Sequence, residues 1–446
     1  MATRDEQRQH PLPLRILFLP FFAPGHLIPV VDMAAIFSAR GARCTILTTP
    51  VNADIIRPAV DRANDSNCHG TASPSPAVDV SVVPFPDVGL PPGMENLMSL
   101  TPAHGAEYPL KFIQAAQLLR EPFDRFMAAH RPDAVVSDSF FSWSADAAAE
   151  HGVPRLVFLG SSVFARCCSE TMLRNNPLET TTSPDDDPAD DARLVSLPGL
   201  PHRVQLRRSQ MMDPRKRPAM WAFHKDNDAA DQRSFGEVFN GFHELEPDYV
   251  EHYHRTLGRA WLLGPVALAS KDMAKRGRPD NTKAHVTEGC LRWMDAKPAG
   301  SVAYVSFGTF TSFSPAELRE LARGLDLSGK DFVWVISSGT GTDGSEWMPE
   351  GFAELMARGG WTQSRPARWQ GHEVIGGEVI AGSIGRLMGS GEEGDAVRKK
   401  AKDLSVKARS AMEKGGSSYG DVGRLMDELM ARRSPGEDTT PLILQK

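Results

Sequence analysis

A strand, a loop, a helix and a second strand follow one another near the N-terminus of this chain. Residues 14–20 form a short apolar run, and a loop rich in Pro and Gly comes next. From about Pro29 the sequence is apolar at helical spacing until Gly41, and a second apolar run covers 43–49. This order predicts a βαβ unit, whose strands are parallel and whose crossover is right-handed.

The same order occurs again in the second half of the chain. After an apolar run at 301–307, Ser314, Pro315 and Glu317 form a capping box that predicts the start of a helix. Another strand follows at 331–337, and in both copies the second strand begins about 30 residues after the first. Two such units in 446 residues predict an α/β fold with two Rossmann-like domains.

Composition indicates where one domain ends. Residues 175–193 and the basic segments 202–209 and 213–218 have few apolar residues and predict solvated loops. Residues 271–283 have the composition of a linker. We therefore expect an N-terminal domain at 1–250, a linker at 251–285, a C-terminal domain at 286–430 and a tail at 431–446.

Charge and cysteine usage narrow the classes of partner. A net charge of −6 gives no general attraction for nucleic acid or an anionic membrane, so a small molecule is the expected partner. Five cysteines without a C-x-x-C spacing exclude a disulfide scaffold and a thiolate zinc site, and they suit a reducing compartment, the cytoplasm. The apolar window 16–36 contains three prolines and Asp32, so we expect no membrane-spanning helix.

Two residues at the ends of predicted strands are candidates for acid–base chemistry. His26 follows the first strand in a loop, just before a helix that we expect to begin near Pro29, and the helix dipole there favours a neutral imidazole. Asp138 ends the predicted strand 132–138, at the same edge of the sheet. A carboxylate beside an imidazole fixes its tautomer and stabilises the imidazolium. A loop histidine with a satisfied hydrogen bond and a carboxylate that caps a loop remain the alternatives.

One glycine motif imitates a dinucleotide site. Gly339, Gly341 and Gly344 spell G-x-G-x-x-G directly after the strand 331–337. A dinucleotide site also needs a helix that opens at the third glycine and an acidic residue after the next strand. The following residues meet neither requirement, so a surface loop is the better interpretation and a dinucleotide-dependent oxidoreductase ranks last.

Several segments resemble plant UDP-sugar-dependent glycosyltransferases of small molecules. They include FLPFFAPGHLIPVVDMAAIFSARG, VVSDSFFSW, CLRWMDAKPAGSVAYVSFGT and EKGGSSYGDVGRLMDEL, and the resemblance covers about residues 14–356 and 372 to the end. It implies the GT-B fold, in which two Rossmann-like domains face each other across a cleft. The N-terminal domain would bind the acceptor and the C-terminal domain the UDP-sugar.

The resemblance also implies roles for individual residues. His26 would remove a proton from the acceptor hydroxyl, Asp138 would orient and balance the histidine, and the sugar would be transferred with inversion and without a metal or other cofactor. The residues implied for donor binding are Gly25, Gly308 and Thr309, with Trp361 and Gln363 as a remnant of the family's donor motif, unless Trp369 and Gln370 are that remnant. Those implied for an aromatic acceptor are Phe22, Phe140 and Trp143, for which core packing is an equally good account.

The chain departs from the family pattern in its second half. The donor signature H-C-G-W-N-S, which supplies diphosphate ligands, is absent from the sequence. Only the runs 261–266, 301–307 and 331–337 predict strands for the C-terminal domain, fewer than a Rossmann half uses, so we expect an internal deletion. The sequence thus predicts a monomeric UDP-glycosyltransferase that transfers a sugar, glucose by preference, to a phenolic acceptor with impaired activity. A non-catalytic small-molecule-binding protein of the same family is the alternative.

Overall fold

The chain forms two compact units in a computed structural model. The structure describes residues 12–68, 77–100, 107–180, 192–269, 284–308, 313–335, 348 and 374–433. The first unit comprises residues 1–96, 111–276 and 406–446, and the second comprises 97–110 and 277–405.

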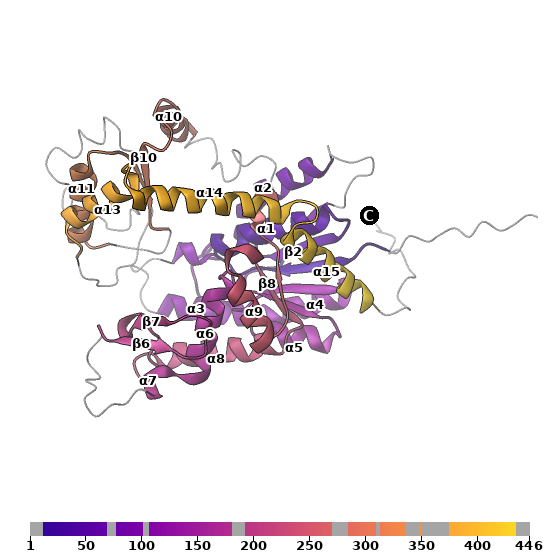
Figure 1. Cartoon of the computed structure of the whole chain (residues 1–446). Helices are drawn as coiled ribbons and strands as arrows, with labels where there is room; N and C mark the ends of the chain where they lie inside the picture. The colour runs from indigo at the N-terminus through magenta and orange to yellow at the C-terminus, as the bar shows by residue number, and fades with distance from the viewer. Residues whose placement is uncertain are drawn as a thin grey trace, which may run out of the picture. The chain divides into compact units, whose positions relative to one another are not determined.

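A seven-stranded sheet is the centre of the first unit (Figure 1). Its strand order is β3-β2-β1-β4-β5-β8-β9, and all six neighbouring pairs are parallel. This order and the parallel strands confirm the predicted Rossmann-like architecture for the N-terminal half. The strands are β1 (Arg15–Leu19), β2 (Arg43–Thr48), β3 (Val78–Val82), β4 (Ala134–Asp138), β5 (Arg155–Phe158), β8 (Gly236–Phe239) and β9 (Ala260–Leu262).

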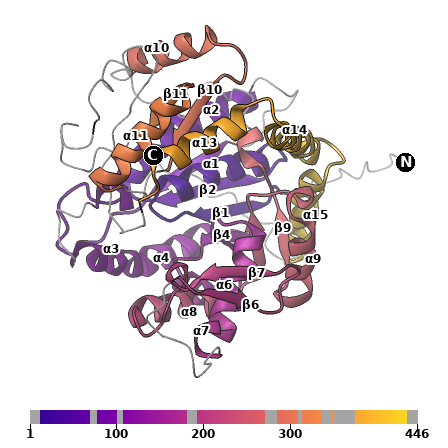
Figure 2. The same ribbon diagram turned by 60° about the vertical axis from the view of Figure 1, so that its left-hand side comes forward.

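Helices cover both faces of this sheet, as its continuous apolar strands require (Figure 2). In β1, Ile16 and Phe18 face a core shared with α1, α2 and α15. The other face is covered by helices that include α4, α5 and α8. The helices of this part of the chain are α1 (Pro24–Ser38), α2 (Pro50–Cys68), α3 (Glu107–Leu118), α4 (Arg120–His130), α5 (Trp143–Glu150), α6 (Val163–Asn175), α7 (Pro177–Thr180), α8 (Pro218–Gln232) and α9 (Pro247–Thr256).

The prediction of loop for the basic segment 202–209 is wrong in part. Residues Val204–Arg207 form β7, which pairs antiparallel with β6 (Leu194–Leu197). Val195 and Leu197 of this hairpin are buried against Cys168 of α6. The basic residues of 202–209 made the segment look like a loop, although it contains a short strand. Most of the buried apolar surface of this hairpin comes from the other strand, β6.

The strand expected for the second domain at 261–266 belongs instead to the first sheet. It is β9, which pairs with β8 along Val238 and Trp261. The C-terminal helix α15 (Ser417–Ala431) contacts this strand, because its apolar face carries Val422, Leu425 and Leu429 into the core of the first unit.

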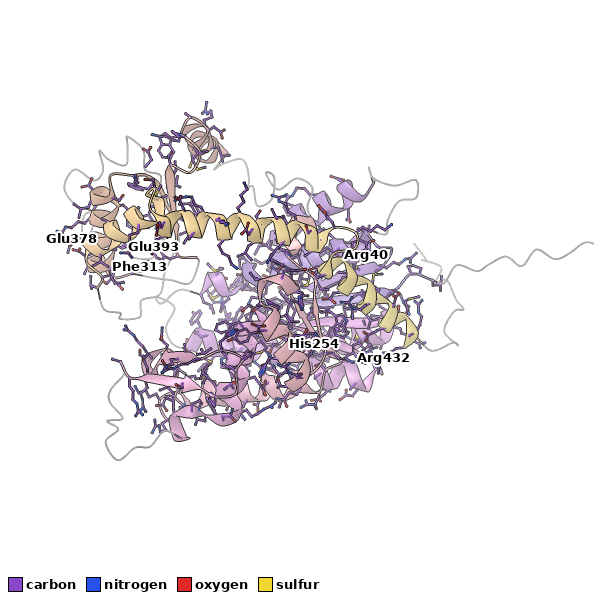
Figure 3. The ribbon with its side chains drawn as sticks, in the orientation of Figure 1. Arg40, His254, Phe313, Glu378, Glu393 and Arg432 are labelled. Atoms are coloured by element: carbon purple, nitrogen blue, oxygen red, sulfur yellow. The ribbon has the colours of Figure 1, made fainter. Side chains whose placement is uncertain are left out.

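Polar contacts fasten α15 to the first unit. Asp421 Oδ2 accepts a hydrogen bond from the amide of Leu262 at 2.9 Å, and Ser418 Oγ donates to the carbonyl of Gly264 at 2.6 Å. Arg40, labelled in Figure 3, lies over the ring of Tyr419 with 3.8 Å between the guanidinium carbon and the ring centroid. The end of the chain is therefore part of the N-terminal unit.

The second unit contains the second predicted βαβ pattern. Strand β10 (Val302–Ser306) pairs in parallel with β11 (Asp331–Val335), and α11 (Pro315–Ser328) connects them. Ser314 and Glu317 form the predicted capping box at the start of α11. These are the two strands among the described residues of this unit. Its other helices are α10 (Ala284–Asp295), α13 (Gly377–Met388) and α14 (Glu392–Met412), the last of which continues into residues of the first unit.

Two glycines bring α11 and α13 close together. A Cβ atom at Gly324 would lie 2.6 Å from Cβ of Ile380, and one at Gly377 would lie 3.0 Å from the amide nitrogen of Gly324. Glu378, which Figure 3 labels in the first turn of α13, forms an ion pair with Arg323 of α11. None of the helices within the described ranges combines the length and the apolarity that crossing a bilayer requires.

Candidate active site

His26 lies in the first turn of α1, not in the loop that the sequence predicted. Pro24 is the first residue of the helix, where no backbone N–H is needed, so the helix begins about one turn before Pro29. The amide of His26 donates to the carbonyl of Ala23 at 2.9 Å. Pro29 stands inside the helix at the cost of one backbone hydrogen bond. The short link from β1 to α1 thus places the imidazole at the carboxyl edge of the sheet.

Asp138 lies at the same edge, because β4 is the parallel neighbour of β1. Its Oδ2 atom is 2.6 Å from Nδ1 of His26, and its Oδ1 atom accepts a hydrogen bond from the amide of Phe140 at 3.0 Å. The Asp138 side chain is fully buried, whereas 20% of the His26 side chain is exposed. The structure therefore brings together the two residues that the sequence placed at neighbouring strand ends.

The pKa of His26 is raised above its ordinary value, contrary to the expectation of a dipole-neutralised imidazole. Burial alone would lower this pKa, but the hydrogen bond to Asp138 and the negative charge of Asp138 outweigh burial. A carboxylate at hydrogen-bond distance acts more strongly than the partial charge of a helix end. With Nδ1–H donated to Asp138, the lone pair of Nε2 is left for a proton from another molecule, which is the arrangement of a general base.

Aromatic side chains surround this pair. The ring centroids of Phe21 and Phe140 lie 5.6 Å and 5.7 Å from the centroid of His26, and those two phenylalanines are 4.9 Å apart. Phe140 is half-buried. Phe21 was not predicted as a site residue, although it is adjacent to Phe22 in the same loop. Phe21 is only 8% exposed, so Phe140 provides most of the aromatic surface next to the imidazole, and this surface suits a flat apolar group.

Two of the predicted acceptor residues are core residues by their burial. Phe22 is 1% exposed, and Trp143 is 7% exposed with its indole N–H donated to the carbonyl of Ala116 at 3.1 Å. Both contact Phe141, which is fully buried. For these two residues the geometry favours core packing, and it leaves Phe140 as the one of the three predicted residues that borders His26.

Hydrogen bonds to the start of α2 fix the loop at 84–96 beside this aromatic cluster. Asn52 at the start of α2 donates to the carbonyl of Glu95 at 2.8 Å, and Asn96 donates to Oδ1 of Asn52 at 2.7 Å. Glu95 Oε2 accepts from the amide of Val51 at 2.9 Å and so caps the helix. The loop carries Phe85, whose ring centroid lies 6.2 Å from that of Phe22. The sequence did not predict these hydrogen bonds, because the residues that they join are more than 40 positions apart.

The predicted donor-binding residues are described only in part. Gly25 has open space where a Cβ would lie, and Gly308 follows β10 with φ +76°, a backbone conformation that favours glycine. Thr309, Trp361 and Gln363 lie outside the described residues, as do Trp369 and Gln370. The described part of the chain holds no group of three His, Cys, Asp or Glu side chains with metal-binding geometry.

The chain is similar to plant glucosyltransferases along nearly its whole length. It is 32% identical to the scopoletin glucosyltransferase of Nicotiana tabacum, over 95% of this chain and 99% of that relative. It is 33% identical to the anthocyanin 3'-O-beta-glucosyltransferase of Gentiana triflora, over 93% of this chain and 98% of that relative. These alignments run over 497 and 498 positions, more than the 446 residues of the chain, so both contain internal gaps in this chain. No protein-family model matches the chain.

Solved structures share the fold. UGT73P12 of Glycyrrhiza uralensis, complexed with glycyrrhetinic acid 3-O-monoglucuronide, superposes with a TM-score of 0.81 at 30% identity, over 94% of this chain and 96% of that chain. TcCGT1 in complex with UDP superposes with a TM-score of 0.70 at 18% identity, over 94% of this chain and 100% of that chain. The second likeness concerns the fold alone.

Proposed function

Since the chain belongs to the plant UDP-glycosyltransferase family, which has the GT-B fold, we propose that it transfers a glucosyl group from UDP-glucose to a hydroxyl group of a small phenolic acceptor. The observation that carries this proposal is the 2.6 Å contact between His26 and Asp138 at an aromatic surface. The names of the relatives from Nicotiana tabacum and Gentiana triflora support glucose as the sugar and a phenolic compound as the acceptor.

His26 acts in this proposal as the general base. Its Nε2 atom takes the proton of the acceptor hydroxyl while the hydroxyl oxygen forms a bond to the anomeric carbon of the sugar. The bond from that carbon to the diphosphate oxygen breaks on the opposite side, and UDP leaves with the electron pair, so the configuration inverts. Asp138 keeps the proton on Nδ1 and stabilises the imidazolium that forms. The proposed reaction uses no metal and no other cofactor.

The second half of the chain, which would bind the UDP-sugar, departs from the family pattern. The sequence lacks H-C-G-W-N-S, and its alignments with the relatives contain internal gaps in this chain. Each lost hydrogen bond to a charged ligand costs about 1–3 kcal/mol, so loss of several contacts weakens UDP-sugar binding by several orders of magnitude. We therefore propose slow transfer at millimolar rather than micromolar donor concentrations.

We further propose that the protein is a monomer in the cytoplasm. Among the described residues, Cys44, Cys167, Cys168 and Cys290 are free thiols, which supports a reducing compartment. The monomeric state is tested directly by light scattering of the purified protein.

An assay of transfer tests the function. The purified protein is incubated with scopoletin and roughly 5–10 mM UDP-glucose, a concentration chosen to exceed the Kd of a weakened donor site. Both the glucoside and free UDP are quantified by chromatography. We expect slow formation of both products in equal amounts, and none with His26→Ala. Product formation by His26→Ala at the rate of the unchanged protein would contradict the role of the base.

A second candidate function follows from the absent donor signature. A non-catalytic member of the family would bind the acceptor through the aromatic surface and release no UDP. Calorimetric titrations with scopoletin and with UDP-glucose separate the two functions. Acceptor binding without any glucoside favours the binding protein, whereas micromolar affinity for UDP-glucose would contradict our view of a damaged donor half.

A further inference from the structure

A buried arginine lies under the strand that carries Asp138. Arg155 begins β5, where it pairs with Val135 of β4. Side chains alternate between the faces of a sheet, so Arg155 projects from the face opposite to Asp138 and shares that face with Ser137. Only 2% of the Arg155 side chain is exposed. A guanidinium buried to this degree needs partners for its charge and for its N–H groups.

Three hydrogen-bond partners of Arg155 connect it to the end of β4. Its Nη2 atom donates to the main-chain carbonyl of Asp138 at 3.3 Å, and Nε donates to Ser144 Oγ at 2.8 Å. Ser144 Oγ is in turn 2.7 Å from the hydroxyl oxygen of Ser137. Nη1 donates to Asp231 Oδ1 of α8 at 3.2 Å and to Ser234 Oγ at 2.7 Å. One side chain thus reaches Asp138 directly and the preceding residue through Ser144.

Asp231 holds the residue on the other side of Asp138. Its Oδ2 atom accepts a hydrogen bond from Ser139 Oγ at 2.6 Å, and its side chain is 4% exposed. The Arg155–Asp231 ion pair is therefore bonded to Asp138 and Ser139 directly, and Ser144 connects it to Ser137. The strand end cannot shift without breaking buried hydrogen bonds, each of which costs about 1–3 kcal/mol when a partner is left unsatisfied.

We propose that Arg155 and Asp231 are positioning residues, which hold the end of β4 so that the Asp138 carboxylate stays within hydrogen-bond distance of His26. Neither residue touches His26, so their effect on the imidazole passes through Asp138. The inference rests on the proposed function for its catalytic meaning, but the geometry that it predicts exists whether or not the chain transfers sugar.

Other charged residues act on this ion pair, and among them the Asp138 carboxylate acts on Arg155 through its charge. Arg166 of α6 has its Nη2 atom 4.0 Å from Asp231 Oδ2, and the Glu237 carboxylate of β8 acts on Asp231 and on Arg155 through its charge. Burial raises the pKa of Asp231 to about 6, against the opposing effect of Arg155. The ion pair is therefore present at pH 7.5, at which the experiment starts.

The test removes both members of the ion pair together and measures the pKa of the His26 imidazole. In the double variant Arg155→Met, Asp231→Asn one positive and one negative charge disappear, so their direct electrostatic effects on His26 largely cancel. The His26 pKa is measured on the full chain by NMR of the histidine side chains, with His26→Gln to assign the signal. We expect this pKa to fall by about one unit, because Asp138 loses its support and burial of the imidazole then dominates.

A matched pair of buried charges provides the control. Arg208→Met, Asp213→Asn removes an ion pair of similar burial, 3.4 Å long, that makes no hydrogen bond to Ser137, Asp138 or Ser139. We expect the His26 pKa to stay unchanged in this variant. An unchanged pKa in the Arg155 double variant, or an equal fall in both variants, would overturn the proposal.

A milder variant covers the case in which the double variant does not fold. Ser139→Ala removes only the hydrogen bond to Asp231 and leaves every charge in place. We expect a smaller fall of the His26 pKa, and a folded Ser139→Ala protein without any fall would count against the positioning role. Because the readout is a proton on His26, a failure of sugar transfer and a failure of this inference are separate results.

Discussion

Replacement of Asp138 by Asn tests the central contact of the site. The Oδ2 atom of Asp138 lies 2.6 Å from Nδ1 of His26, and the carboxylate is fully buried while the imidazole is one-fifth exposed. An opposite charge at this distance typically raises a histidine pKa by about 1–3 units, which equals about 1.4–4 kcal/mol of stabilised imidazolium. Asn has nearly the same shape but no charge, so burial then dominates. We expect the His26 pKa to fall below 6.5, its ordinary value.

The same substitution changes how stability depends on pH. The raised pKa of His26 in the folded protein adds stability that is complete below the unfolded-state value near 6.5 and is lost as pH rises through the folded value. Asp138→Asn should therefore destabilise the protein more at pH 5.5 than at pH 9. If the chain transfers sugar, turnover should also fall, on the order of 10²–10⁴-fold, because the base loses its orienting partner.

NMR titration of the histidine side chains and urea unfolding at the two pH values measure these effects. Asp133→Asn is the matched control, because Asp133 precedes the opposite end of the same strand, where it pairs with Arg433 at 2.9 Å. This control should leave the His26 pKa unchanged. A His26 pKa that stays above 6.5 in Asp138→Asn would refute the reasoning, since no other described contact raises it.

Three further predictions concern stability and are measured by urea unfolding of the full chain. Gly324→Ala should cost about 1–3 kcal/mol of stability, because the new Cβ would lie 2.6 Å from Cβ of Ile380. As a control, Gly382→Ala in α13 places a Cβ with no atom within 4 Å and should be neutral or stabilising. Equal effects of the two substitutions would contradict the close crossing of α11 and α13. Burial raises the pKa of Glu170 to about 7, so its charge destabilises the folded protein increasingly as pH rises from about 4.5 to 7, and Glu170→Gln should be more stable than the unchanged protein at pH 8 but not at pH 4. Ser418→Ala should cost about 1 kcal/mol through the lost 2.6 Å bond to the Gly264 carbonyl. The exposed Ser410→Ala in α14 should be neutral or slightly stabilising, because Ala favours helices more than Ser does, and an equal effect of the two substitutions would contradict the contribution of the Ser418 bond.

The strands and the histidine–aspartate pair were predictable because their signals are local. Short apolar runs ending in loop residues marked β1, β4 and β10 within a residue or two. His26 and Asp138 are 112 residues apart, yet the parallel arrangement alone places both strand ends at one edge. The capping box of Ser314 and Glu317 was equally readable, since a helix start depends on four adjacent residues.

The assignment of elements to units was not predictable in the same way. β9 has only three residues, and nothing in its apolar sequence distinguishes one parallel sheet from another. Its place beside β8 depends on the register that joins Val238 to Trp261. It depends also on α15, far along the chain, where Asp421 accepts a hydrogen bond from the amide of Leu262. Such pairings are decided by which apolar faces remain to be covered, a property of the assembled sheet.

The sequence by itself determined the α/β class, the family and the identity of the candidate base, because these depend on residue order and local motifs. Only the tertiary structure decided the direction in which the pKa of that base shifts and the contacts that support it. The direction of the His26 pKa depends on a carboxylate 2.6 Å away, and the Asp138 backbone depends on Arg155, whose bond to Asp231 spans 76 residues. Electrostatic and hydrogen-bond energies vary steeply over a few ångströms, and distances of that kind exist only once the chain has folded.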